Sequence, residues 1–222
     1  LCMHREILDF AQWIPPTSEE IKLRAIVIQR LRTALKMLWP GASILCHGST
    51  ATKTYLPNGD LDFVVINAPE ESEVELLTEL NDHLLSVSMF RKSEVIKNAK
   101  CPIIKAIEKP FGFHLDIAIN NFNGILNIQR NLNLMKTFPQ IYPLFILLKL
   151  FLYQNRLNEP YHGGISSNTL QQMILFIIQC SRPIHKMNLG ALLMLFLQTF
   201  GVSFNYIATG ISTRFNGRLF AR

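Results

Sequence analysis

The most informative part of the chain is residues 43–66, SILCHGSTATKTYLPNGDLDFVVI. Short apolar runs at its two ends, residues 43–46 and 61–66, are typical of buried β-strands. Gly48-Ser49 follows the first run, and a Leu-Pro-Asn-Gly turn signal at residues 56–59 precedes the second. We therefore expect a strand, a turn that leads into a short helix, and a second strand.

Two aspartates, Asp60 and Asp62, stand at the start of the second strand. Because side chains alternate between the two faces of a strand, both carboxylates project from one face and Leu61 points the other way, into a core. Two like charges side by side are unfavourable, and a bound divalent cation offsets that repulsion. Magnesium prefers carboxylate oxygens as ligands. The pair therefore predicts a magnesium site.

A third carboxylate, Asp116, lies in a second apolar strand pattern at residues 113–119. Alternation places it on the face opposite Leu115 and Ile117. If this strand neighbours the first, three carboxylates form a cluster that can hold two metal ions about 3.5–4 Å apart. We therefore expect Asp60, Asp62 and Asp116 to be catalytic residues that bind two Mg²⁺ or Mn²⁺ ions. Asp116 is the candidate general base, or the metal ligand, on the attacking side.

Gly48 and Ser49 stand where a strand meets the start of a predicted helix. Backbone N–H groups at such a junction favour phosphate, and glycine lets the backbone come close to a ligand. The segment is no P-loop, because it has no G-x-x-x-x-G-K-[ST] pattern. Gly-Ser, D-x-D and the third aspartate are each weak signals, but together they predict metal-dependent transfer of a nucleotide.

Composition narrows the class of protein and of partner. The 222 residues carry a formal net charge of +6, which favours polyanions such as nucleic acid, although a basic protein without such a partner has the same charge. The cysteines are scattered along the chain, so we do not expect a zinc knuckle. Scattered thiols instead indicate a protein of a reducing compartment. They are Cys2, Cys46, Cys101 and Cys180. No apolar run reaches the roughly 18 residues of a membrane span, and we expect no membrane partner.

The periodicity predicts an α/β (α+β) fold with a small mixed sheet, which includes a further strand at residues 102–107. Thr17 and Glu20 have capping-box spacing, and a helix is expected from there to about Trp39. Further helical patterns cover residues 70–88 and the stretch from 123 to about 200. We expect a catalytic palm at 40–120, inserted in a helical central domain built from 1–39 and 121–222. The first helix should pack with the last ones, and we expect the chain to be a fragment truncated at its C-terminal end.

At these residues the sequence resembles the DNA-polymerase-β-like nucleotidyltransferases, and among them the poly(A) RNA polymerases of the polymerase-sigma type. That type provides the catalytic subunit of TRAMP-like complexes. The resemblance runs almost from end to end. Stretches that carry it include His47-Gly48-Ser49, Asp60-Leu61-Asp62, Pro102-Ile103-Ile104-Lys105, His114-Leu115-Asp116 and Gly163-Gly164-Ile165-Ser166-Ser167.

The resemblance implies transfer of AMP from ATP to RNA 3′ ends, as poly(A) or oligo(A) addition in RNA surveillance and decay. It implies nucleotide contacts at Gly48 and Ser49 for the triphosphate, Asn123 or Asn127 for the ribose, Lys149 for a phosphate, and Ser167 and Asn168. Lys149 also fits a lysine whose stem lies along apolar surface while its head reaches water. The family usually has an aromatic residue where Asn168 stands, and loss of base stacking costs about 1–3 kcal/mol. His47 also replaces a usual aromatic residue, and we interpret it as a packed residue at the strand end.

Partners and location follow from the same resemblance: a zinc-knuckle RNA-binding protein, a helicase, and the nucleus, with the cytoplasm as the alternative. Terminal uridylyltransferases share the three aspartates and the Gly-Ser pair, so a terminal uridylyltransferase stays open as an alternative function. So does a catalytically weak RNA-binding scaffold module, which is motivated by Asn168. It is also motivated by the end of the chain at Arg222, before any clear copy of the family's nucleotide recognition motif.

Overall fold

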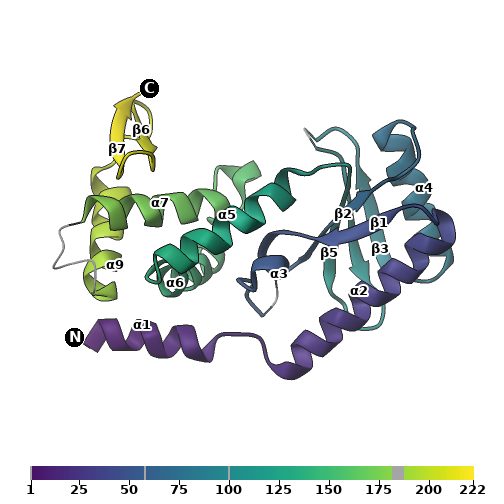
Figure 1. Ribbon diagram of the computed structural model, residues 1–222, viewed down its shortest axis with the longest axis horizontal. Coiled ribbons are helices and arrows are strands. Elements are labelled where there is room, and N and C mark those ends of the chain that lie inside the picture. Colours follow the sequence, from purple (N-terminus) through teal and green to yellow (C-terminus); the bar gives the residue numbers. More distant parts are fainter. Residues whose placement is uncertain (1, 58, 100, 182–187) are drawn as a thin grey trace. The chain divides into compact units, whose positions relative to one another are not determined.

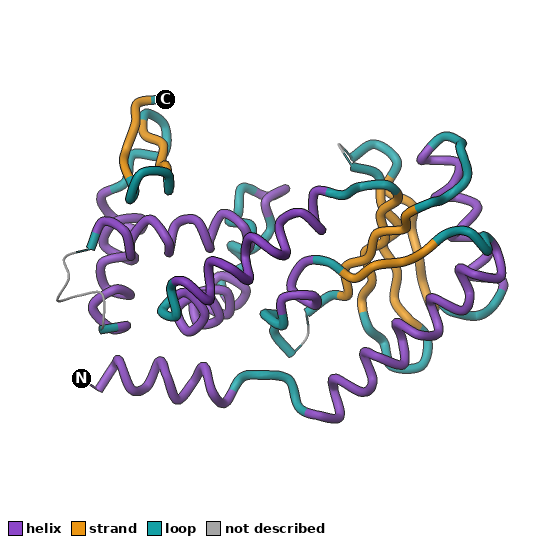
Figure 2. Tube along the Cα trace, in the orientation of Figure 1, coloured by secondary structure: helices purple, strands orange, loops and turns teal. Residues whose placement is uncertain are grey.

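The computed structural model of the chain describes residues 2–57, 59–99, 101–181 and 188–222. The chain divides into two compact units (Figure 1). The sheet unit is formed by residues 15–132, and the helical unit by residues 1–14 and 133–222. Figure 2 shows that strands dominate the centre of the sheet unit and helices make up most of the other. The expected α/β (α+β) class is confirmed.

Five strands form the mixed sheet in the order β1-β2-β5-β4-β3. They are β1 Ser43–Cys46, β2 Leu61–Ile66, β3 Phe90–Ile96, β4 Ile103–Glu108 and β5 His114–Ile119. β2 and β5 are parallel, and the other neighbours are antiparallel. Four of the strands were predicted. β3 was not, because this edge strand reads FRKSEVI and its mostly polar, largely exposed side chains give no apolar run.

Two helices, α2 (Ser18–Leu38) and α4 (Glu73–Ser86), cover one face of this sheet (Figure 1). The core between them contains Phe63 of β2 and Ile117 of β5, both fully buried. Side chains alternate along a strand, so the residues next to these in sequence point to the opposite face. That opposite face carries Asp62 and Asp116.

The placement of α2 corrects one expectation. The helix itself was predicted, and Thr17 caps it by accepting a hydrogen bond from Glu20 N at 3.2 Å. It was expected to join the helical domain, yet it buries Val27, Leu31 and Leu35 against the sheet. The apolar face of the sheet would otherwise be exposed to water, and α2 buries an apolar stripe against it. The division between units therefore falls at residues 14/15 rather than at 40, and at 132/133 rather than at 120.

The helical unit joins the start of the chain to its last part. The helices in its described part are α1 Cys2–Trp13, the end of α5 (Asn123–Thr137), α6 Ile141–Gln154, the short η1 Pro160–His162, α7 Ser167–Cys180, α9 Leu189–Gln198 and η2 Thr199–Ser203. α1 packs against α6 and α9, and His4 Nδ1 accepts a hydrogen bond from Leu189 N at 3.1 Å. The sheet unit is thus an insertion, as expected, but α1 is the N-terminal helix that pairs with the last ones.

A short hairpin ends the chain, with β6 at Thr209–Ser212 and β7 at Arg218–Ala221. It was not predicted, because two four-residue strands give too little periodicity. Within the described residues, no single helix is long and apolar enough to cross a membrane. Helices α5 and α6, which are bent at their junction, together reach the length and apolar composition of a membrane span. However, α6 packs much of its length into the core of the helical unit.

Candidate active site

Asp62 and Asp116 occupy the same register position on two neighbouring parallel strands. Asp62 of β2 pairs with Asp116 of β5, while Leu61 and Leu115 beside them are buried in the core. Residues opposite one another in a sheet project from the same face. β2 and β5 are therefore neighbours, which is the condition on which the predicted cluster depended, and two half-buried carboxylates lie side by side.

Asp60 is exposed and lies just before β2, where its carbonyl accepts a hydrogen bond from Thr50 Oγ1 at 3.4 Å. In the described part of the chain, no three His, Cys, Asp or Glu side chains already stand close enough to hold a metal ion. The donors present nevertheless fit Mg²⁺, because hard carboxylate oxygens are the ligands it selects. Asp62 and Asp116 are the two predicted ligands that lie together, and Asp60, two residues from Asp62, stays the predicted third ligand.

Gly48 lies directly against Asp62, one member of this acidic pair. Its φ of +58° is one that L side chains rarely adopt, and a Cβ there would overlap Asp62 Oδ2. The neighbouring His47 N donates to the carbonyl oxygen of Asp62 at 3.0 Å. Only glycine fits at this position. The helix that follows, α3 (Gly48–Thr52), has five residues, and phosphate binding by Gly48 and Ser49 stays a prediction.

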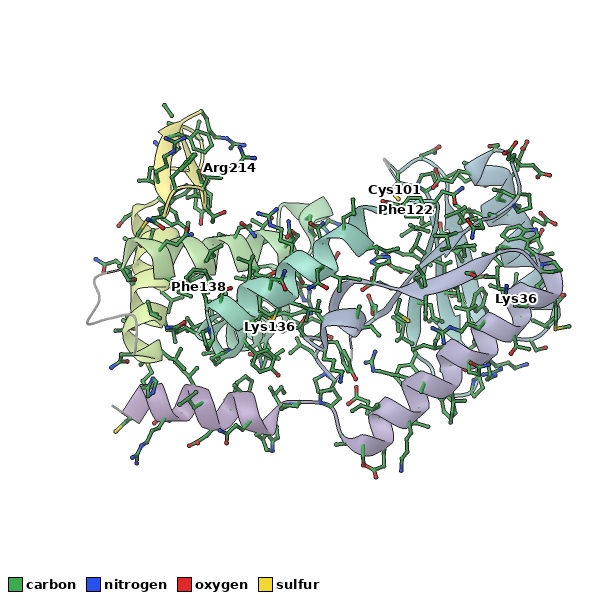
Figure 3. The ribbon with its side chains drawn as sticks, viewed as in Figure 1. Lys36, Cys101, Phe122, Lys136, Phe138 and Arg214 are labelled. Carbon is green, nitrogen blue, oxygen red and sulfur yellow. The ribbon has the colours of Figure 1, made fainter. Side chains whose placement is uncertain are left out.

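A cavity of about 150 Å³ opens beside the carboxylates, and its lining is drawn from β2, β4, β5 and the start of α5. It is lined by His47, Asp62, Phe63, Cys101, Ile103, Asp116, Ala118, Asn121 and Gly124. Asn121 Nδ2 donates to Cys101 Sγ at 2.8 Å, and Cys101 is labelled in Figure 3. Residues Cys101 and Asn121 were not singled out from the sequence, since neither belongs to a motif.

Lys105 was also missed as a site residue. It stands opposite Asp116 in the register of β4 and β5, and its Nζ lies 3.8 Å from Asp116 Oδ2. The lysine is more than half exposed, so the ion pair adds little to stability. Its alternation with buried Ile104 and Ala106 was the signal that could have placed it on the same face as the carboxylates.

His47 lies half-buried between the end of β1 and the start of α5. A Cβ on Gly124 would come within 2.6 Å of His47 Nδ1, so the ring packs against this glycine. Burial lowers the pKa of His47 below its ordinary value, and a backbone hydrogen bond at Phe63 and the negative charge of Asp116 oppose that shift. The neutral ring is thereby favoured, which agrees with the interpretation of His47 as a packed residue.

The remaining predicted nucleotide contacts fall into two groups. Asn127 lies half-buried one turn along α5, in the sheet unit, whereas the side chain of Asn123 lies outside the described residues. Lys149 of α6 has its ammonium 5.8 Å from the Phe145 ring centroid. Ser167 and Asn168 lie at the first positions of α7, after the cap Ser166, and both are exposed. These last three belong to the helical unit, and their nucleotide contacts stay predictions.

Comparison with known proteins gives a consistent result. The family model described as "Poly(A) RNA polymerase, mitochondrial-like, central palm domain" matches residues 3–138. Poly(A) RNA polymerase cid14 of Schizosaccharomyces pombe is 33% identical, over 99% of this chain and 33% of its own length. Poly(A) RNA polymerase protein 2 of Saccharomyces cerevisiae is 33% identical, over 93% of this chain and 37% of its own length. The chain thus spans about a third of the length of these curated relatives.

A solved structure described as the polymerase core of TRAMP, an RNA surveillance complex, has the same fold. It aligns with a TM-score of 0.86 and 31% identity, over 98% of this chain and 70% of that one. The family model covers more than half of the chain, and it includes β1 to β5 with both aspartate strands. The chain therefore belongs to the polymerase-sigma type poly(A) RNA polymerases of the DNA-polymerase-β-like nucleotidyltransferases, as its sequence motifs predicted.

Proposed function

We propose that this chain is the catalytic part of an enzyme that adds AMP from ATP to RNA 3′ ends without a template. The observation that carries the proposal is the Asp62–Asp116 pair on parallel strands, with Gly48 held against Asp62. Poly(A) RNA polymerase relatives over nearly the whole chain support adenine as the base. The net charge of +6 supports a polyanionic acceptor.

Asp60, Asp62 and Asp116 would hold two divalent cations. Such ions neutralise charge on the triphosphate and make the 3′-hydroxyl of the RNA a better nucleophile. Asp116 is the candidate to accept the hydroxyl proton. It lies beside Lys105 as well as Asp62, and the positive charge of Lys105 partly offsets the repulsion between the two carboxylates.

Gly48 leaves the space beside the Asp62 carboxylate free of side-chain atoms of its own, so a polyphosphate can approach closely there. Ser49 would donate to that polyphosphate. Asn123 or Asn127 would meet the ribose, Lys149 a phosphate, and Ser167 and Asn168 the rest of the nucleotide. Asn168 offers no stacking surface, which weakens base binding by about 1–3 kcal/mol relative to an aromatic residue.

The proposal extends to the setting of the enzyme. The similar solved structure is described as the core of an RNA surveillance complex. That likeness supports a nuclear role in RNA surveillance and decay, with a zinc-knuckle RNA-binding protein and a helicase as partners. The cytoplasm is the alternative location, and tagging of the full-length protein in cells, followed by fluorescence microscopy and by mass spectrometry of co-purified proteins, tests both points.

The decisive experiment is a primer-extension assay. The full-length protein is incubated with an end-labelled RNA, Mg²⁺ and each of the four nucleoside triphosphates in turn. We expect extension with ATP, abolished in Asp62→Asn and retained in Asp9→Asn, an exposed aspartate of α1. A preference for UTP would identify a terminal uridylyltransferase instead. RNA binding without extension by any nucleotide would identify a scaffold module.

A further inference from the structure

Arg24 is a buried cation on the core-facing side of α2. Only 2% of its surface is exposed, whereas Ile21, one turn earlier, is 50% exposed. Moving a guanidinium out of water costs several kcal/mol unless its contacts compensate. An arginine on the buried side of an otherwise amphipathic helix therefore calls for strong, specific partners.

Those partners are in the turn that precedes β2. Arg24 Nη2 donates to the carbonyl oxygens of Gly59 at 2.9 Å and Pro57 at 3.3 Å. The same nitrogen lies 3.2 Å from Glu20 Oε1, one helical turn away. Gly59 is the residue directly before Asp60, and the first residue of β2 follows Asp60. The guanidinium thus holds the main chain at the point where the acidic strand begins.

A second set of contacts reaches the other acidic strand. The guanidinium carbon of Arg24 lies 4.0 Å from the ring centroid of Tyr55 and 5.0 Å from that of Phe113. Tyr55 directly precedes the turn that leads to Asp60, and Phe113 directly precedes β5. Cation–π contacts of this kind stabilise a buried guanidinium more strongly than an exposed one, because water no longer competes with the rings. Arg24 Nη1 is buried with no hydrogen-bond partner among the described residues.

We propose that Arg24 is a positioning residue that sets the separation of the acidic residues on β2 and β5, and thereby the affinity for the divalent cations. This inference rests on the proposed function, because it assumes that Asp60, Asp62 and Asp116 bind those cations. One buried group contacts both chain segments that lead into the acidic strands. A shift of either segment moves a carboxylate relative to its partner.

Arg30, on the same helix, provides a matched comparison. Its Nη1 lies 2.5 Å from Oε1 of the fully buried Glu108, at the end of β4. It pairs with this carboxylate rather than with the carbonyls of Pro57 and Gly59. Loss of either arginine's buried contacts should therefore destabilise the sheet unit, but only Arg24 should change the metal site.

The experiment measures Mn²⁺ binding to the full-length protein by the loss of the free-ion electron paramagnetic resonance signal. The variants are Arg24→Lys, Arg24→Met and Arg30→Lys. Lysine keeps the charge but lacks the planar guanidinium that lies over the rings of Tyr55 and Phe113. We expect Arg24→Lys to raise the half-saturating Mn²⁺ concentration about tenfold, the range typical of groups that orient metal ligands. Arg24→Met, which loses the charge as well, should raise it at least as much. Arg30→Lys should lower the melting temperature and leave Mn²⁺ binding unchanged.

Two further readouts separate positioning from simple loss of fold. Hydrogen exchange at the amides of Leu56, Gly59 and Asp60 should accelerate in Arg24→Lys and not in Arg30→Lys. The Mg²⁺ concentration for half-maximal RNA extension should rise in Arg24→Lys, and excess Mg²⁺ should restore part of the rate. A purely structural role would reduce the active fraction without moving that midpoint.

Equal Mn²⁺ affinity in the wild type and Arg24→Lys would overturn the proposal, and so would equal shifts in the Arg24 and Arg30 variants. A wild type that binds Mn²⁺ but extends no RNA would remove the proposed function, and the Mn²⁺ shift would still decide the role of Arg24. A wild type that binds no Mn²⁺ would overturn both.

Discussion

Among the described residues of the sheet unit, two charged side chains lie in the core, Arg24 and Glu108. In the described part of the helical unit, the buried polar side chains are the uncharged Gln171 and Ser181. The helical core otherwise consists of apolar side chains from α1, α6, α7, α9 and η2. Apolar packing stabilises a unit without fixing the position of any one polar group, whereas buried charges need particular partners in particular places. The buried charges of the sheet unit therefore fix the positions of the chain segments that they contact.

The largest effect should come from Asp62→Asn. It removes one carboxylate of the pair, and loss of metal-dependent stabilisation worth about 4 kcal/mol lowers the extension rate about a thousandfold. In EDTA the variant should melt at the same temperature or higher, because a repulsion with Asp116 is relieved. Extension assays and thermal melts check this, with Asp9→Asn of the helical unit as the control. If Asp62→Asn lost activity only because it unfolds, Asp62 would have a structural role in the sheet unit rather than a role in metal binding.

Leu192→Ala should give the next largest effect, and on stability alone. Leu192 is fully buried in the helical core, and a leucine-to-alanine change there costs about 3 kcal/mol, from lost burial plus the cavity left behind. Half-saturation with Mn²⁺ should not change. Denaturant unfolding measures the loss, and Met194→Ala, 56% exposed on the same helix, should stay within about 0.5 kcal/mol of the wild type. A shift in Mn²⁺ binding would show that the two units are not separable in this way.

Gly48→Ala should cost about 1–2 kcal/mol of stability, because alanine is strained in the left-handed region. Its Cβ would also displace the Asp62 carboxylate, and we expect weaker Mn²⁺ binding. Two glycines separate these causes. Gly112 has φ +77° and open space within 4 Å of where a Cβ would stand, and Gly41 has neither strain nor contact. Gly112→Ala should lower stability only, and Gly41→Ala should change neither property. Unchanged Mn²⁺ binding in Gly48→Ala would argue against the close approach of Gly48 to Asp62.

The smallest effect concerns His47 and pH. Burial lowers the pKa of this histidine, so the unfolded chain binds a proton at higher pH than the folded chain does. The contribution of His47 to stability is therefore full above the unfolded pKa, near 6.5, and is lost as the pH falls through the lower folded value. Melts in EDTA at pH 8 and pH 5.5 should show His47→Phe gaining on the wild type at the lower pH. An identical difference at both pH values would refute this.

Local pattern was enough for much of the fold. The capping box at Thr17, the apolar runs of β1, β2 and β5 and the turn before Asp60 were visible, since each depends on neighbours in sequence. β3 and the terminal hairpin were missed, because polar or very short strands depend on their partners for stability. The unit to which α2 belongs was also missed. An apolar stripe shows that one side of a helix is buried, but it does not show which element covers that side.

The sequence by itself supplied the residues of the candidate site: Asp62 and Asp116 in two apolar strand patterns, Asp60 next to the first of these patterns, and Gly48 where a strand meets a predicted helix. Alternation and residue type depend only on the local chain, so these features could be derived without coordinates. Only the tertiary structure decided that β2 and β5 are neighbours with Asp62 opposite Asp116. It also decided that Arg24 reaches the carbonyls of Pro57 and Gly59, 33 and 35 residues away. Strand pairing and the burial of a charge depend on residues that are distant in sequence. Local periodicity does not show which of these distant residues come into contact.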